Sequence, residues 1–251
     1  MDRSADAPGG VRLMTMRFNG SGDGVRFSTS GAPSMTALTL IWWRKVITKN
    51  DSTARTELFI ERTGDFATSR HTVSGTNVNQ WGAAGGSAGS FSPSEPEDDG
   101  AWVMFAHVCN GTGANGSQLY SWALGAADGS YKLAQSTHSG AAVINSWGLG
   151  NYGGEYRDAE YCFTKIFGAA LSLAELQAER RQGKPVRTTN VISYHRMRNG
   201  SDTADDSGNS RTLTLQGTPA DGVASEPVPW QAGGLLLLRN PIANIGLPRA
   251  A

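Results

Sequence analysis

Along most of this chain, the side chains fall into two sets that alternate from one position to the next. That alternation is typical of β-strands, because successive side chains of a strand point to opposite faces of its sheet. The segment 101–109 is the clearest example, since one set including Trp102 and Met104 alternates with a second including Val103 and His107. Strands are predicted at residues 11–18, 24–28, 36–47, 56–62, 67–74, 101–109, 117–125, 130–136 and 158–167.

Residues 158–185 combine a well-defined strand with the clearest helical pattern of the sequence. Alternation within the strand predicts two faces, with Cys162, Thr164 and Ile166 on one and Tyr161, Phe163, Lys165 and Phe167 on the other. Ser172 and Glu175 have the spacing of a capping box, in which each side chain accepts a hydrogen bond from a backbone N–H. Gly183 and Pro185 are expected to end the helix.

Residues 36–47 are apolar at almost every position, as expected for a central strand with both faces covered. Trp42 and Trp43 must then point to opposite faces. One is expected in the core, and the other against whatever covers the outer face of the sheet.

Residues 78–100 lose the strand period and become rich in glycine, serine and acidic residues. They form the longest candidate loop, and Trp81 and Phe91 are its large apolar side chains. Long ordered loops on a rigid scaffold often carry recognition sites.

Five segments carry a resemblance to a known family. KIFGAALSLAELQAE resembles the closing strand and short helix of laminin-G-like domains in the concanavalin A-like lectin/glucanase superfamily. Four other segments resemble strands of the same domains in the same order: MRFNGSGDGVRF, LTLIWWRKV, GAWVMFAHVCNG and the late hairpin ISYHRMRNGSDTADDSGNSRTLTLQG. The resemblance implies an all-β, two-sheet antiparallel β-sandwich of the jelly-roll type with one short helix. It does not specify a function, because lectins, hydrolases, adhesion modules and virion proteins share this scaffold.

The 251 residues are expected to form one domain with two tails. Residues 1–10 are predicted to be an N-terminal arm, 11–222 the laminin-G-like jelly roll, and 223–251 an extended C-terminal assembly tail. The tail is rich in proline and yet apolar, so it needs a surface to cover it. The predicted assembly residues are Trp230, Leu235, Leu236, Leu237, Leu238, Ile242, Ile245 and Leu247.

The balance of 22 basic and 22 acidic residues, without a basic run, does not favour nucleic acid or an anionic membrane surface as a partner. The N-terminal residues lack an apolar stretch of signal-peptide length, and no segment reaches the length of a membrane span. A soluble protein made in the cytoplasm is therefore expected. Cys109 and Cys162 are too few for a disulfide scaffold, so two buried thiols are predicted, with a bridge between strands as the alternative.

Two patterns near residues 148–160 suggest enzymes but do not fit them. The G-x-G-x-x-G at 148–153 is not followed by a helical pattern, which a dinucleotide site needs. Glu155, Asp158 and Glu160 resemble the catalytic E-x-D-x-x-E of laminarinase-type members of the superfamily, but their spacing is E-x-x-D-x-E. In a regular strand Glu155 would face away from the other two, so no catalytic pair and no enzyme activity are predicted.

Carbohydrate binding is a third interpretation of the same region. Sugars pack their C–H faces on aromatic rings and need planar polar partners for their hydroxyls. The candidate glycan-binding residues are Trp81, Asn145, Trp147, Asn151, Tyr152 and Tyr156. The alternative is that Trp147 belongs to the core and that the tyrosines are rim residues.

Asp205, Asp206 and Asn209 are weak candidates for calcium, because members of the superfamily hold this ion near loop carboxylates. A tight turn stabilised by the same Asp and Asn side chains explains the pattern without a metal. The turn is the favoured interpretation, and no cofactor is predicted.

Three classes of function fit these features to different degrees. A structural protein of a bacteriophage virion, as a capsid decoration or tail component, accounts for both the fold and the apolar tail. Its partners would be other virion proteins, copies of itself and surface glycans. A carbohydrate-binding lectin module for host adsorption is the alternative, whereas a glycoside hydrolase accounts for the fold alone.

Overall fold

The computed structural model describes residues 15–28, 37–47, 55–62, 65–73, 77–83, 89–90, 100–110, 113–138, 144–152, 155–156 and 158–223. Side chains are described at 15–27, 37–47, 100–110, 116–135, 148–150 and 158–223. The predicted arm 1–10 and all tail residues after Val223, including the eight assembly residues, lie outside these ranges. The domain boundaries therefore remain predictions.

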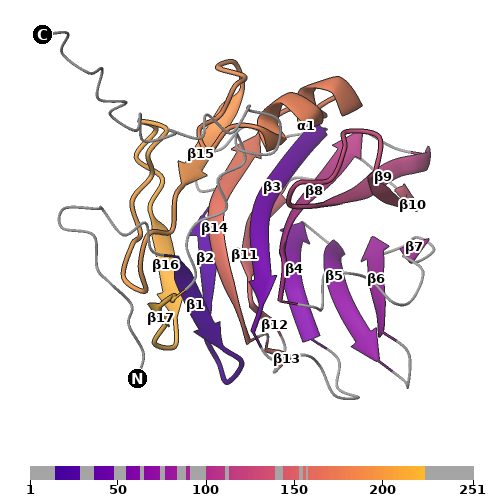
Figure 1. Cartoon of the computed structure of the whole chain (residues 1–251). Coiled ribbons are helices and arrows are strands. Elements are labelled where there is room, and N and C mark those ends of the chain that lie inside the picture. Colours follow the sequence, from indigo (N-terminus) through magenta and orange to yellow (C-terminus); the bar gives the residue numbers. More distant parts are fainter. Residues whose placement is uncertain are drawn as a thin grey trace, which may run out of the picture.

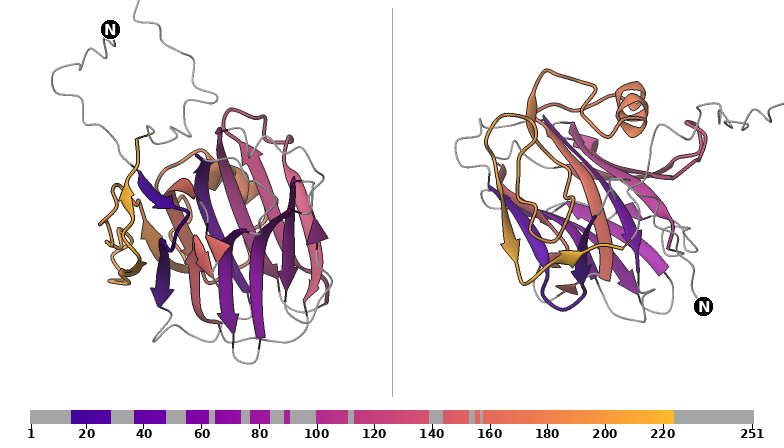
Figure 2. Two further views of the ribbon diagram at one scale, coloured as in Figure 1. Left: turned by 90° about the horizontal axis from the view of Figure 1, so that it is seen from below. Right: turned by 60° about the vertical axis from the view of Figure 1, so that its left-hand side comes forward.

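Two antiparallel sheets face each other (Figures 1 and 2). Sheet A has the order β10 (Lys132–His138), β9 (Gly113–Ala123), β8 (Trp102–Asn110), β3 (Ala37–Val46), β14 (Asp158–Phe167), β1 (Met16–Asn19) and β17 (Ala220–Asp221), and β15 (Val191–His195) also pairs with β14. Sheet B has the order β16 (Leu213–Gln216), β2 (Gly24–Ser28), β11 (Ile144–Leu149), β4 (Arg55–Arg62), β5 (Asp65–Val73), β6 (Asn77–Ala83) and β7 (Gly89–Ser90). β12 (Asn151–Tyr152) and β13 (Glu155–Tyr156) form a separate ladder.

The predicted fold class is confirmed: the molecule is an all-β sandwich with a short helix, α1 (Leu173–Arg180). The capping box is formed as predicted, because the Ser172 Oγ accepts a hydrogen bond from the Glu175 N–H and the Glu175 carboxylate accepts one from the Ser172 N–H. α1 lies outside the sandwich near one end of β3 and β8 (Figure 1).

Apolar side chains gather on both faces of sheet A. The inner core lies between the sheets and contains Phe18, Phe27, Trp42, Phe105, Tyr161 and Ile166 among others. The outer core lies on the other face, where α1 covers part of it, and contains Trp43, Met104, Trp122, Phe163, Phe167 and Leu176 among others. Trp42 and Trp43 thus enter different cores, as the sequence predicts.

The predicted faces of β14 are wrong at two residues, Tyr161 and Cys162. Phe163 has a φ of 50°, and the register against β3 shifts between Cys162 and Lys165. This β-bulge puts Tyr161 on the inner face with Ile166, whereas Cys162 and Phe163 are both in the outer core. Strict alternation cannot reveal such an inserted residue.

The predicted loop at 78–100 is also corrected. Its first part belongs to β6, which pairs with β5 along its whole length, and residues 89–90 form β7. The polar composition of β6 hides the strand, since backbone pairing with β5 does not depend on side-chain character.

The predicted late hairpin does not form either. β15 pairs with β14 in sheet A, whereas β16 pairs with β2 in sheet B. Between them, the Asp206 N–H donates to the Tyr194 carbonyl at 2.7 Å and the Asp205 carboxylate accepts the Tyr194 N–H at 3.0 Å. The turn therefore uses the carbonyl and the N–H of Tyr194, which a hairpin partner of β15 would need for its own backbone hydrogen bonds.

Cys109 and Cys162 are both buried thiols outside any disulfide, in agreement with the prediction. Cys109 lies in the inner core and Cys162 in the outer core. The sheet separates them, so the alternative of a bridge is wrong.

Gly150 shows what the G-x-G-x-x-G pattern does here. Its φ is 86°, and a Cβ at this position would overlap the ring of Phe18. The glycine is required by close packing in the inner core.

We expect Gly150→Ala to lower the free energy of unfolding by roughly 2–5 kcal/mol, because it adds overpacking to a left-handed backbone conformation. Gly129→Ala is the matched control, since a Cβ there would meet no atom within 4 Å. Urea denaturation of both variants measures the difference. Equal stability of the two variants would contradict the packing role of Gly150.

Candidate functional site

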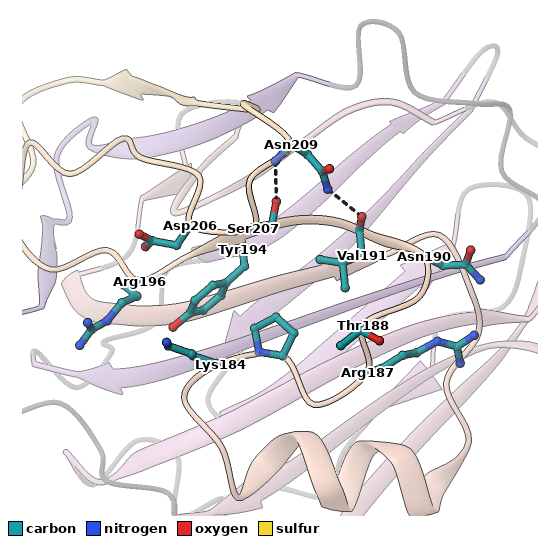
Figure 3. A pocket seen from close by; sticks show the side chains of 11 residues that line it. Lys184, Arg187, Thr188, Asn190, Val191, Tyr194, Arg196, Asp206, Ser207 and Asn209 are labelled. Atoms are coloured by element: carbon teal, nitrogen blue, oxygen red, sulfur yellow. Dashed lines mark hydrogen bonds between the residues drawn. The ribbon is translucent and has the colours of Figure 1, made fainter.

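A pocket among the described residues lies between β15, the segment 184–190 after α1 and the turn 206–209 (Figure 3). Its volume is about 560 Å³, within the usual range of small-ligand sites. Its charged and hydrogen-bonding lining includes Lys184, Arg187, Thr188, Asn190, Arg196 and Asn209. The pocket is thus polar as well as concave.

The first wall of the pocket is held by Lys165, a buried lysine of β14. Its Nζ donates to the Glu179 carboxylate at 2.9 Å and to the carbonyls of Glu179, Gln182 and Lys184 at 2.9, 2.6 and 3.0 Å. Burial lowers the pKa of Lys165 to about 8, and the attraction of Glu179 opposes that shift. The ammonium therefore binds the end of α1 and the start of the pocket wall to sheet A.

The Glu179 carboxylate completes this attachment. Its Oε1 accepts the N–H groups of Val186 and Arg187 at 2.9 and 2.8 Å, while its Oε2 pairs with Lys165. The wall then turns at Asn190, which has a φ of 59° and whose carbonyl accepts the Gly168 N–H at 2.8 Å. Asparagine tolerates this left-handed conformation better than most residues.

The opposite wall is held by Asp205. Its carboxylate accepts N–H groups of Tyr194, Ser207 and Arg211 at 3.0, 2.9 and 2.9 Å. Burial would raise the pKa of Asp205, but these donors hold it below its ordinary value. The carboxylate thus ties the turn to β15, which carries Tyr194 of the pocket.

These contacts are those of the turn that the sequence favours over a calcium site. The Asn209 amide nitrogen donates to the Val191 and Ile192 carbonyls at 2.9 and 3.1 Å, and Asp206 pairs with Arg198 at 3.6 Å. Among the described residues, no three His, Cys, Asp or Glu side chains form a group that could hold a metal.

Several polar groups of the pocket have no partner within the described part of the chain. They are the Lys184 ammonium, the Thr188 hydroxyl, the Asn190 amide and the Asn209 Oδ1. Arg187 is engaged, since its guanidinium pairs with Glu175 at 2.6 Å and donates to the Thr189 carbonyl at 3.1 Å. The pocket therefore offers both donors and acceptors to a ligand.

For the glycan-binding candidates predicted from the sequence, the structure describes the position of the backbone alone. Trp81 is in β6, Asn145 and Trp147 in β11, Asn151 and Tyr152 in β12, and Tyr156 in β13; their side chains lie outside the described residues. The β12–β13 ladder pairs Asn151 with Tyr156, and Trp147 is the register partner of the core residue Phe27. Strands β4 and β5 separate β6 from β11, so the structure does not bring Trp81 to the others.

The three acidic residues do not belong to one strand. Glu155 is in β13, whereas Asp158 and Glu160 are in β14. Asp158 pairs with Arg17 at 3.2 Å, and the fully buried Glu160 accepts the Thr15 hydroxyl at 2.5 Å and the Val223 N–H at 3.1 Å. Both described carboxylates therefore have structural partners.

A second polar cluster, of His107, Cys109 and Ser117, lies within the inner face of sheet A. The His107 Nε2 is 3.0 Å from the Ser117 Oγ and 3.6 Å from the Cys109 Sγ. All three residues are at most 3% exposed, so a substrate has no access to them.

No family model matches the sequence, and a search of curated proteins gives no match either. Solved structures do match. A structure named "putative carbohydrate binding protein" from Bacteroides ovatus ATCC 8483 superposes with a TM-score of 0.55 at 13% identity, over 86% of this chain and 62% of that chain. A heptameric SAP-like pentraxin from Limulus polyphemus has a TM-score of 0.47 at 13% identity, over 82% and 95% of the two chains.

The enzymatically active domain of tailspike protein 2 from bacteriophage CBA120 has a TM-score of 0.46 at 15% identity, over 74% of this chain and 34% of that chain. The chain has a concanavalin A-like jelly-roll fold. The predicted resemblance is thus confirmed for the fold. The concanavalin A-like scaffold does not by itself identify a ligand.

The pocket wall is held by two residues whose role the sequence pattern did not predict, Lys165 and Glu179. A signal was present, because Glu179 and Arg180 share the buried face of α1 with Leu176. A charged side chain on the buried face of a helix is rarely stable unless it is paired, so these two residues indicate polar partners within the protein. Arg180 indeed donates to the Ala126 and Ala127 carbonyls.

We expect Lys165→Met to lower the free energy of unfolding by about 3–5 kcal/mol, because it leaves the Glu179 carboxylate buried without its cation. Adding Glu179→Gln should recover part of the loss. The control is Arg181→Gln, which breaks an exposed pair with Asp128 and should cost less than about 1 kcal/mol. Denaturant titration of the variants gives the comparison, and a cost for Lys165→Met as small as the control's would refute the anchoring role.

Proposed function

We propose that this protein is a non-catalytic interaction protein of a bacteriophage virion, as a capsid decoration or tail component, and that it binds a glycan in the pocket beside β15. The observation that carries the glycan-binding part is the pocket itself, with groups on Lys184, Thr188, Asn190 and Asn209 that have no partner among the described residues. Saccharides need such a mixture of donors and acceptors in a concave site.

The fold supports the same proposal. The Bacteroides ovatus structure, whose name mentions carbohydrate binding, shares the fold of this chain. The rigid attachment of both pocket walls is also favourable, because a preorganised site loses less entropy when a ligand binds. Affinity for one sugar should be low, so adhesion would depend on many displayed copies.

The proposal excludes catalysis because a glycosidase needs two carboxyl groups on either side of the scissile bond. In the pocket, the described lining contains one carboxylate, Asp206. Asp158 and Glu160 are bonded to Arg17, Thr15 and the Val223 N–H.

The virion part rests on the sequence resemblance and on the apolar segment after Val223. The Val223 N–H donates to the buried Glu160 carboxylate, and the Gly222 N–H donates to the Thr15 carbonyl at 2.6 Å. These bonds fix the point on sheet A from which the assembly segment starts. A lectin module for host adsorption could use the same pocket, but it would not need this segment.

We expect Thr188→Trp to weaken glycan binding at least tenfold, because the exposed Thr188 lines the pocket and an indole would fill it. Thr189→Trp is the matched control, since Thr189 is also exposed but does not line the pocket. A glycan array identifies a ligand, calorimetry compares the variants, and mass spectrometry should recover the ligand intact.

Variants of the aromatic candidates test whether the glycan site lies elsewhere. If Trp81→Ala combined with Tyr152→Ala abolishes binding and Thr188→Trp does not, the glycan site is on those strands and the pocket assignment is wrong. Cleavage of the recovered glycan would refute the non-catalytic role.

We expect a chain that ends at Glu226 to fold normally but to remain monomeric and absent from particles, because it keeps the contacts of Gly222 and Val223 and lacks the apolar segment. Light scattering, circular dichroism and incorporation into virions are the measurements, with the full-length chain as the control. Normal assembly of the shortened chain, or its failure to fold, would contradict the assembly role of residues 227–251.

A further inference from the structure

A second hollow adjoins the pocket beside β15. Its volume is about 410 Å³, and its lining comes from α1 and the residues after it, including Ala178, Gln182 and Val186. Lys184 and Pro185 line both hollows. In Figure 3 their segment runs between the helix and β15, so these two residues form a ridge between the pocket and the second hollow.

The ridge is fixed by the buried ion pair of Lys165 and Glu179. The Lys165 ammonium donates to the Gln182 and Lys184 carbonyls at 2.6 and 3.0 Å. The Glu179 carboxylate accepts the Val186 N–H at 2.9 Å. The same pair therefore holds the pocket wall, the ridge and part of the second hollow, so the two hollows keep a constant spacing.

The ridge and the second hollow offer both polar and apolar contacts. The exposed Gln182 amide and the Lys184 ammonium have no partner within the described part of the chain. Val186 is 47% exposed and presents an apolar surface. A saccharide needs both kinds of contact, because its hydroxyls form hydrogen bonds and its C–H faces pack on apolar groups.

We propose that the two hollows form one extended site for a linear oligosaccharide of several sugar units, and this inference rests on the proposed glycan-binding function. One unit occupies the pocket beside β15, where Thr188, Asn190 and Asn209 bond to its hydroxyls. The chain crosses the ridge beside the Lys184 ammonium. A later unit of the same chain lies in the second hollow against Val186.

An extended peptide is the less favoured occupant, because it binds mainly through main-chain hydrogen bonds to an open strand edge. The edge of β15 that borders the pocket is already engaged. The Asn209 amide donates to the Val191 and Ile192 carbonyls, and the turn 205–206 bonds to the carbonyl and the N–H of Tyr194. A ligand at this edge is therefore recognised by side chains.

An oligosaccharide that reaches both hollows should bind more tightly than one that fills the pocket alone. Once its first unit is bound, the contact of the later unit is intramolecular, which raises the affinity of the whole chain. The ridge needs little ordering for that second contact, because it is held in place before the ligand binds.

The test is calorimetry of the full-length chain with three ladders: cello-oligosaccharides, chito-oligosaccharides and hyaluronan oligosaccharides, each from the disaccharide to the hexasaccharide. In the ladder that binds, we expect the hexasaccharide to bind at least about tenfold more tightly than the disaccharide. The disaccharide, which is too short to cross the ridge, is the internal reference.

Three tryptophan substitutions at exposed positions locate the two parts of the site. Gln182→Trp fills the second hollow, which Gln182 lines without lining the pocket, and should reduce hexasaccharide affinity about tenfold, to that of the disaccharide. Thr188→Trp fills the pocket and should weaken binding of both oligosaccharides. Thr189→Trp is the matched control, because Thr189 lines neither hollow. Circular dichroism checks that each variant is folded.

The possible failures are distinguishable. Equal affinity along the ladder, or an effect of Gln182→Trp on the hexasaccharide no larger than that of Thr189→Trp, overturns the extended site and leaves glycan binding in the pocket intact. Loss of disaccharide binding in a folded Gln182→Trp variant also overturns it, because the second hollow is then not a separate part of the site. No binding of any ladder overturns both the extended site and the proposed glycan binding. A proline-rich peptide that binds more tightly than every oligosaccharide overturns the choice of ligand.

Discussion

The buried ion pair between Lys165 and Glu179 is the contact on which the candidate site depends. A helix of eight residues is not stable in isolation, so α1 must be held by what it contacts. Leu176 contributes apolar packing in the outer core, but the Lys165 ammonium also binds three carbonyls at the end of the helix and after it. Such a pair adds little net stability, yet it defines one position for the segment that lines the pocket.

The bulge at Phe163 is what makes this pair available. Tyr161 faces the inner core, so strict alternation would direct Phe163 and Lys165 inward as well. The positive φ of Phe163 shifts the register, and Lys165 emerges on the outer face under α1. A single irregular residue thus removes a charge from the inner core and gives it a function in positioning.

The parts of the structure that the sequence predicts are those set by local patterns. The alternation in 101–109 assigns Trp102 and Met104 to one face, and the outer core contains both. The pocket was not predictable in this way, because Lys165 meets residues 14 to 19 positions away and Asp205 meets Tyr194 through backbone groups. When a side chain bonds to a backbone carbonyl or N–H group, its partner can be almost any type of residue. The sequence therefore shows no pattern at the partner position.

The geometry of β14 relates the pocket to the proposed assembly segment. β1 pairs with Asp158–Tyr161 and β15 with Thr164–Phe167, so both lie along the same edge of this strand. Glu160, which holds Val223, and Lys165, which holds the pocket wall, lie opposite Lys45 and Ile41 of β3, which are four residues apart, or roughly 13 Å at 3.3 Å per residue. A subunit fixed through the segment after Val223 would therefore keep its pocket at a constant distance from the attachment point. Binding by many copies benefits from that constancy, because the spacing between sites then follows from the spacing of the subunits.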